Sequence, residues 1–289
     1  MRIRNGADFL ERTILSHIDF FDEIVAVYQP STDATPDILA RLEEHHGDKL
    51  RVYAWTDRVF PPGSTGHAET PADSPASMVN YSNFALAMTT TRTVTKLDDD
   101  HLAIPEAVGR VVGGLRQAGG AGDDMLCFSG INLIADPDGR LAVPGQDRLA
   151  GSGDHGYFDV TSDSVFTHDR RFERMPRPRG RRCFCGFLYW HLKYLKAGKG
   201  FANYELEDNP DSRFARRKKR LETRPDMLSL AELRGLVSPD LKMQVAALLG
   251  DKQRLVLDRA RSLTQAFPDD SLEAALRRTV APEYLESIL

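Results

Sequence analysis

Three consecutive aspartates, Asp98, Asp99 and Asp100, follow the apolar-alternating segment TVTKL at residues 93–97. Two carboxylates about 5 Å apart repel by roughly 3 kcal/mol at an effective dielectric near 20, and a cation relieves that repulsion. Asp98 and Asp100 point to the same side of an extended segment, where they can share one hard divalent ion that keeps sites open for phosphate oxygens. The triplet therefore favours a metal ion bound to a nucleotide diphosphate, and a solvated acidic turn is the alternative.

The elements that position this triplet follow from hydrophobic periodicity. The N-terminal third alternates helical and extended patterns, which is typical of βαβ units on a largely parallel sheet that binds ligands at the carboxyl ends of its strands. Helical patterns cover residues 7–21, 35–46 and 77–88, strand patterns cover 22–29 and 49–55, and a loop rich in Pro, Gly, Ser and Thr covers 60–76. The fold class predicted is α/β.

Beyond the aspartates, the patterns predict a helix at 104–117, a hairpin at 124–143 that turns at DPDG, a short strand at 162–169, and a mixed apolar and basic helix at 184–200 ended by glycine. Lys193, Lys196 and Lys199 would form the basic face of that last helix, directed at a diphosphate or anionic acceptor, or simply solvated.

Composition limits the function classes. The chain has 289 residues, 41% of them hydrophobic, and a net charge of -4, so it has no global field that would hold a nucleic-acid backbone. Its three cysteines are too few for a disulfide framework, which favours a cytoplasmic protein. From Glu205 the composition shifts to a basic run and proline-broken helices, so we expect a main domain over 1–208 and a helical C-terminal extension over 209–289.

Three segments resemble the nucleotide-sugar-dependent glycosyltransferases of the A fold, especially family 2. RNGADFLERTI at 4–14, FDEIVAVYQPSTDATPDIL at 21–39 and VTKLDDD at 94–100 look like that group's opening segment, its second strand with the Ser-Thr-Asp turn, and its DxD motif, in matching order and spacing. The resemblance implies a Rossmann-like, mostly parallel sheet flanked by helices. It also implies transfer of a sugar from a nucleotide-sugar donor, with Mn or Mg bridging the diphosphate.

The resemblance assigns roles residue by residue. Asp98 and Asp100 inherit the metal, Asp99 a ribose or sugar contact, and Arg4, Asp33 and Lys96, which lie in the three matched segments, belong with the donor site. Where the family typically carries an acidic residue that reads the nucleobase, this chain has Tyr28 and Gln29. An amide can pair with a base edge and a phenol can stack on a base, so the donor stays open between UDP-, GDP- and similar sugars.

The family's inverting members use a carboxylate that deprotonates the acceptor hydroxyl. GSGDHGYF is the nearest match to the segment that carries it, which makes Asp154 the predicted base and Glu173 its competitor. SDSVFTHD looks like the family's late strand that ends in histidine, so His168 is predicted to complete the metal ligands. A helix-capping role for Asp154 and a structural role for His168 are the alternatives.

Two further readings stay open. A Mg-dependent phosphohydrolase of the haloacid-dehalogenase type also places DxD after a strand, although His101 and Leu102 follow the triplet where that chemistry usually has Thr or Val. A sugar- or nucleotide-binding module without catalysis is the third reading. The basic run ARRKKR at 215–220 is a solvated face or, with a saccharide acceptor linked to lipid, a peripheral contact with the inner face of a membrane. Oligomeric state cannot be read from the residues.

Overall fold

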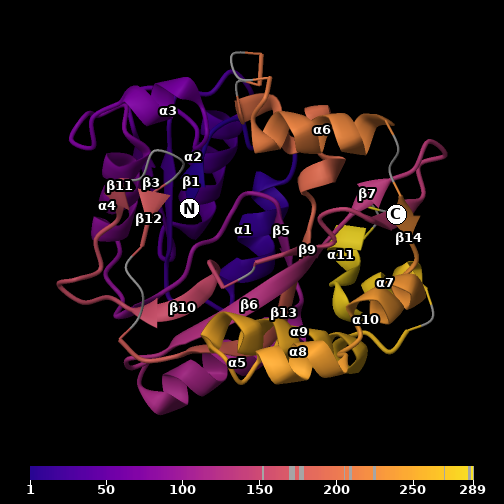
Figure 1. The fold of residues 1–289 in the computed structure, drawn as a ribbon. Coiled ribbons are helices and arrows are strands. Elements are labelled where there is room, and N and C mark those ends of the chain that lie inside the picture. The colour runs from indigo at the N-terminus through magenta and orange to yellow at the C-terminus, as the bar shows by residue number, and fades with distance from the viewer. Residues whose placement is uncertain are drawn as a thin grey trace.

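The computed structural model describes residues 1–151, 153–168, 173–175, 179–204, 206–207, 210–223, 226–269, 271–285 and 288. The chain forms a mixed α/β structure with several sheets and helices (Figure 1). Among the described residues, every helix is too short or too polar to span a bilayer.

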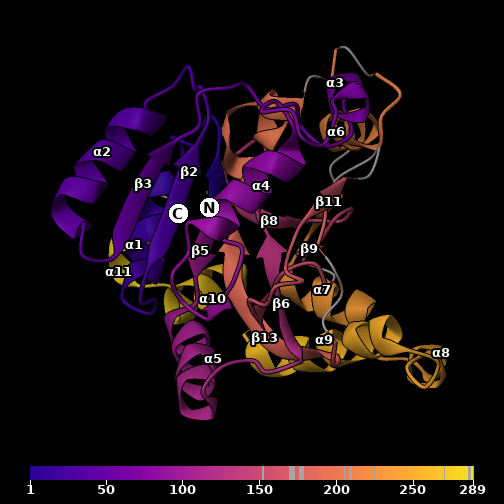
Figure 2. The ribbon, with the colours of Figure 1, turned by 90° about the vertical axis from the view of Figure 1, so that its left-hand side faces the viewer.

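The first sheet is parallel, as predicted, in the order β1 (Arg2–Ile3), β2 (Ile24–Tyr28) and β3 (Leu50–Ala54). Successive residues of β2 face opposite sides, so Ile24 and Ala26 pack with α1 (Leu10–Ile18) and α2 (Thr35–His46), while Val25 and Val27 pack with α4 (Met78–Ala87). Helices therefore cover both faces of this sheet (Figure 2). The segment predicted as a plain loop contains a short helix, α3 (Thr65–Glu69), which begins where Ser64 Oγ accepts a hydrogen bond from the His67 amide.

The second sheet is mixed, so the mostly parallel sheet that the resemblance implies for the whole fold is not found in this part of the chain. Its order is β4 (Thr93–Val94), β10 (Gly156–Asp159), β6 (Met125–Asn132), β13 (Arg182–His191) and β5 (His101–Ala103), with β9 (Leu149–Ala150) beside β6. Within it β6 and β13 are parallel and the other pairs are antiparallel. Helix α5 (Pro105–Ala118) lies where the periodicity predicts it and packs on one face.

The helix predicted at 184–200 is wrong. The segment forms strand β13, followed by the 3-10 helices η1 (Lys193–Leu195), η2 (Ala197–Gly200) and η3 (Ala202–Tyr204). Phe187 and Trp190 pack into one core, whereas Leu188 and Tyr189 pack into another. Residues 183–190 between Arg182 and His191 form an uninterrupted uncharged run, and both faces are buried in its second half. Periodicity cannot separate such a strand from a buried helix.

Smaller strands complete the arrangement. The hairpin predicted at DPDG is formed by β7 (Ile134–Ala135) and β8 (Leu141–Pro144), and β14 (Met227–Leu228) adds to its edge. Strand β6, predicted as part of that hairpin, belongs to the second sheet instead because it pairs with β13 along its whole length. The short strand predicted near Thr167 is β11 (Thr167–His168), which pairs with β12 (Glu173–Arg174).

The C-terminal part is helical, as expected. Its helices are α6 (Arg213–Thr223), α7 (Leu230–Val237), α8 (Leu241–Ala246), α9 (Asp251–Ala266), α10 (Leu272–Thr279) and α11 (Pro282–Leu285). Trp190 is buried against Phe267, and its indole N–H donates to Thr279 Oγ1 at 2.9 Å. Helices α7, α9, α10 and α11 thus share one hydrophobic core with β13. Helix α6 buries Phe214 and Leu221 in a separate cluster, and Figure 1 shows it apart from the other C-terminal helices.

Candidate functional site

A cavity of about 1020 Å³ lies where the two sheets meet, and the aspartate triplet forms part of its wall. The sequence suggested that the triplet directly follows a strand. In the structure it does not, because β4 stops at Val94 after its short antiparallel pairing with β10. The aspartates instead occupy the turn that leads into β5. Of the residues predicted from the sequence, those in the cavity wall are Arg4, Gln29, Lys96, Asp98, Asp99, Asp100, Asp154 and Glu173.

Each aspartate of the triplet has a lysine partner. Lys96 Nζ lies 3.0 Å from the Asp98 carboxylate. Lys196, which follows η1, places its Nζ 2.9 Å from Asp99 Oδ2 and 2.9 Å from Asp100 Oδ2. The repulsion among three adjacent carboxylates is therefore offset by two ammonium groups, one near in sequence and one almost a hundred residues away.

These contacts separate the acidities of the three carboxyls. Burial opposes ionisation of Asp98, but Lys96 and two nearby imidazoles outweigh it and hold the pKa of Asp98 well below its usual range. Burial and the neighbouring Asp100 charge outweigh Lys196 at Asp99, and they raise the pKa of Asp99 to about 6. Burial also opposes ionisation of Asp100, but Lys196 and the imidazole of His191 outweigh it, so the pKa of Asp100 falls well below its usual value. Asp98 and Asp100 thus lose their protons at a lower pH than Asp99 does.

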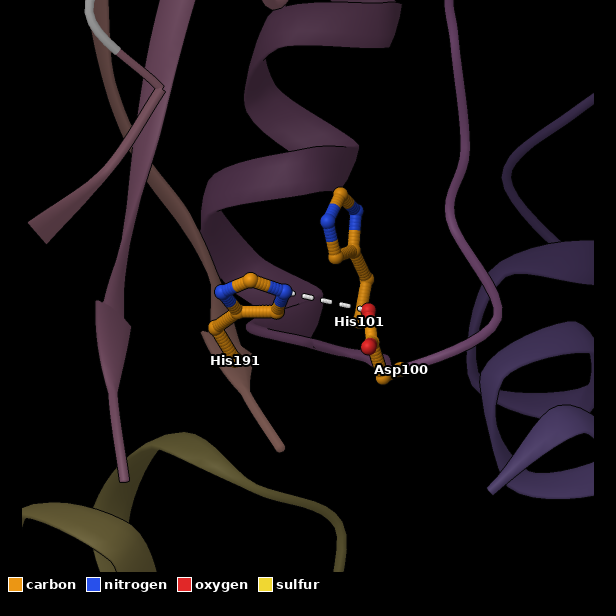
Figure 3. Close-up of side chains that lie close together, drawn as sticks. All are labelled: Asp100, His101 and His191. Carbon is orange, nitrogen blue, oxygen red and sulfur yellow. Dashed lines mark hydrogen bonds and ion pairs between the residues drawn. The ribbon is translucent and has the colours of Figure 1, made fainter. Parts of the chain in front are cut away.

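His191 ends β13 beside Asp100. Its Nε2 lies 3.1 Å from Asp100 Oδ1, as the dashed line in Figure 3 marks. Its Nδ1 contacts Asn132 Oδ1, and Asn132 Nδ2 donates to the carbonyl of Asp147. Because the Asn132 amide is oriented by its own donation, its oxygen accepts from Nδ1. Nε2 faces the Asp100 carboxylate, so it either donates a proton to that carboxylate or gives up the proton to bind an ion. Metal-binding imidazoles are held in this way, with the second ring nitrogen donating to an oxygen.

Two more histidines surround Asp98. His101 is 1% exposed and stacks on Tyr189 with ring centroids 3.7 Å apart. Its Nε2 is buried without a hydrogen-bond partner and lies 3.8 Å from Asp98 Oδ2. His155 Nε2 lies 3.7 Å from the same oxygen, and His155 Nδ1 contacts the Tyr189 hydroxyl at 3.0 Å. Burial lowers the pKa of both histidines, so both rings are neutral near pH 7 and each can offer a lone pair.

A metal ion fits this donor set. Ligand atoms of Asp100, His101 and His191 lie within 4.8 Å of one another (Figure 3). One carboxylate and two imidazoles suit Mn²⁺ or a later transition metal better than Mg²⁺, which prefers oxygen ligands alone. The orphaned nitrogen of His101 is the observation that favours a ligand here, because buried polar atoms are normally satisfied.

Other predicted residues lie elsewhere or carry structural contacts. Among the described residues, Tyr28, Asp33 and His168 are outside the cavity wall. The Asp33 carboxylate accepts from the amides of Ala7 and Thr35 and so joins the opening segment to α2. His168 lies in β11 with its ring 5.1 Å from that of His67, and the histidines grouped with Asp100 are His101 and His191.

The two candidate bases differ in their surroundings. Glu173 Oε1 accepts from Arg2 at 2.7 Å. Burial opposes ionisation of Glu173, but Arg2 outweighs it and lowers the pKa of that carboxyl. Asp154 lies in the cavity wall immediately before His155, in the segment that leads into β10. Glu173 is therefore held by an ion pair that weakens it as a base.

Sequence reasoning missed His191, Asn132 and His155 as site residues, and it placed Lys196 on the basic face of a helix that does not form. The helix predicted over β13 also hid His191. A strand reading would have placed His191 at a strand end, where ligands of α/β proteins gather. Asn132 carries no sequence signal of its own, because its role depends on the register that sets it beside His191.

Comparisons with known proteins give distant structural likenesses. No family model matches the chain, and no curated protein matches it. Among solved structures, the crystal structure of S. aureus TarS 1-349 is similar with 13% identity over 92% of this chain and 82% of that chain, at a TM-score of 0.38. A second crystal structure of S. aureus TarS shares 12% identity over 99% of this chain and 53% of that chain, again at 0.38.

Proposed function

We propose that this protein is a metal-dependent glycosyltransferase of the A fold that moves a sugar from a nucleotide-sugar donor to a saccharide or glycolipid acceptor with inversion. The observation that supports it most is that residues from separate segments of the chain meet in one cavity. Arg4, Gln29 and the aspartate triplet come from three separate segments chosen by their resemblance to one family, and all lie in the wall of one cavity.

The cavity has the size and charge for such a donor. Its volume of about 1020 Å³ is at the upper end of small-molecule sites, which run to roughly 1,000 Å³. Arg2, Lys96, Lys193 and Lys196 are among its cationic lining residues and can approach a diphosphate. A divalent ion held by Asp100 with His191 and His101, beside Asp98, would act as a Lewis acid on the leaving diphosphate.

Asp154 is the base in this proposal. It needs to reach the acceptor hydroxyl from the side of the sugar opposite the diphosphate, and its carboxylate must be ionised to take the proton. Glu173 is a weaker base because its carboxylate forms an ion pair with Arg2. Below about pH 6, Asp99 can present a protonated carboxyl as a donor to a sugar or ribose oxygen.

The test is calorimetric binding of UDP and GDP with and without Mn²⁺, followed by hydrolysis of the matching nucleotide sugars. Asp100→Asn should abolish Mn²⁺-dependent binding, and Asp138→Asn, a matched loss of charge in the exposed β7–β8 turn, should not. Binding without any turnover would favour the non-catalytic module. Phosphate release from a generic phosphomonoester would favour the phosphohydrolase, and no nucleotide binding at all would reject the proposal.

A further inference from the structure

The side chain of Lys196 lies where a cation shared by Asp99 and Asp100 would lie. Its Nζ is 2.9 Å from an oxygen of each carboxylate, and the side chain is 12% exposed. The backbone around it is fixed by other contacts: the Leu192 amide donates to the Asp100 carbonyl at 2.8 Å, and the Ala197 amide donates to Asp8 Oδ2 at 2.9 Å. The ammonium can therefore move without moving the chain that carries it.

Both oxygens of Asp100 already have partners. Oδ1 faces His191 and Oδ2 faces Lys196. A divalent ion that binds Asp100 together with His191 and His101 would lie within a few ångströms of this ammonium, where like charges in a poorly hydrated site repel strongly. Ion binding and the ion pair of Lys196 with Asp100 are for this reason in competition.

We propose that Lys196 is an exchangeable internal cation: it neutralises Asp99 and Asp100 in the absence of a divalent ion, and it is released from Asp100 into the cavity when the ion binds. Lys196 and Lys193 both line the cavity, so the released ammonium faces the volume that an anionic ligand would fill. The competition with metal stands on the contacts of Lys196 alone, and its second half, contact with a diphosphate, rests on the proposed function.

The exchange couples two binding events. If Lys196 hinders the ion and then assists the diphosphate, each ligand should tighten the binding of the other, because coupling between two sites is reciprocal. Loss of the lysine should tighten the ion and weaken the diphosphate. If Lys196 merely fills space, its loss would not tighten the binding of the ion and weaken the binding of the diphosphate at the same time.

The experiment is calorimetric titration of Mn²⁺ into the wild type, Lys196→Met and Lys199→Met. Lys199 is the matched control because it lies in the next turn, outside the cavity wall, and its replacement removes the same charge. Mn²⁺ should bind Lys196→Met at least tenfold more tightly than it binds the other two proteins. Equal or weaker Mn²⁺ binding by the variant, or no binding by any of the three, would overturn the proposal.

A second variant and a second ligand complete the test. Lys196→Gln keeps a hydrogen-bond donor near the carboxylates without the charge, so it should reproduce the gain in Mn²⁺ affinity if Lys196→Met does not fold. At saturating Mn²⁺, UDP and GDP should bind Lys196→Met at least tenfold more weakly than wild type. If neither nucleotide binds the wild type while the Mn²⁺ result holds, the proposed function fails and the competition stands.

Discussion

Replacing Asn132 tests whether His191 is a metal ligand. Asn132 is buried at the end of β6, opposite His191 in the parallel register with β13. Asn132→Leu keeps the size of the side chain but removes the acceptor for His191 Nδ1–H. Without that acceptor, the ring can keep its proton on Nε2, where it blocks coordination beside Asp100.

The expected loss follows from the role of such supporting contacts, which typically contribute 10- to 100-fold to metal affinity. Mn²⁺ binding should weaken by that factor, or about 1.4–2.7 kcal/mol. Asn132→Asp restores an acceptor for Nδ1 and should bind Mn²⁺ within a few-fold of wild type. Both variants lose the donation to the Asp147 carbonyl, so a shared fall in melting temperature reports that contact alone.

Calorimetric Mn²⁺ titration is the assay, with nitrogen chemical shifts of the His191 ring to report its tautomer. The reasoning is refuted if Asn132→Leu folds and binds Mn²⁺ as tightly as wild type, or if Asn132→Leu and Asn132→Asp lose affinity equally.

Four other outcomes are expected. Asp98→Asn should keep the fold but lose Mn²⁺-dependent nucleotide binding in calorimetry; unchanged affinity would remove this carboxylate from the metal site. Asp154→Asn should bind donor normally but transfer sugar on the order of a hundred- to ten-thousand-fold more slowly, with Glu173→Gln milder, and the reverse ranking in a steady-state assay would exchange their roles. Burial raises the pKa of Asp99 to about 6, so the folded state still holds a proton that the unfolded chain releases near pH 4. The protonated Asp99 therefore contributes its full share of stability below about pH 4, and this share is lost as pH rises through 6. Asp99→Asn should therefore gain stability over wild type from pH 4 to 7, by at most about 3 kcal/mol in metal-free urea titrations, and a flat difference would contradict the assigned shift. A chain ended at Leu206 should not unfold cooperatively on heating, because Trp190 would lose the helices that cover it; a sharp transition would instead support a separable domain over 1–208.

The sequence alone determined the local elements with clear periodicity. Helices α1, α2, α4 and α5 and strands β2 and β3 could be predicted because each has one polar and one buried side, or a short apolar run between turn residues. It also indicated the aspartate triplet as a candidate site, because three carboxylates adjacent in the chain are close together in any fold and repel one another when ionised.

Tertiary structure decided what those aspartates contact. Strand β13 is apolar on both faces between Arg182 and His191, so its sequence is ambiguous, and only its pairing between β6 and β5 sets His191 beside Asp100. Lys196 reaches the triplet from almost a hundred residues away because the chain turns back after that strand. Which cation neutralises which carboxylate is a matter of distance in space, and no pattern of neighbours along the chain carries that information.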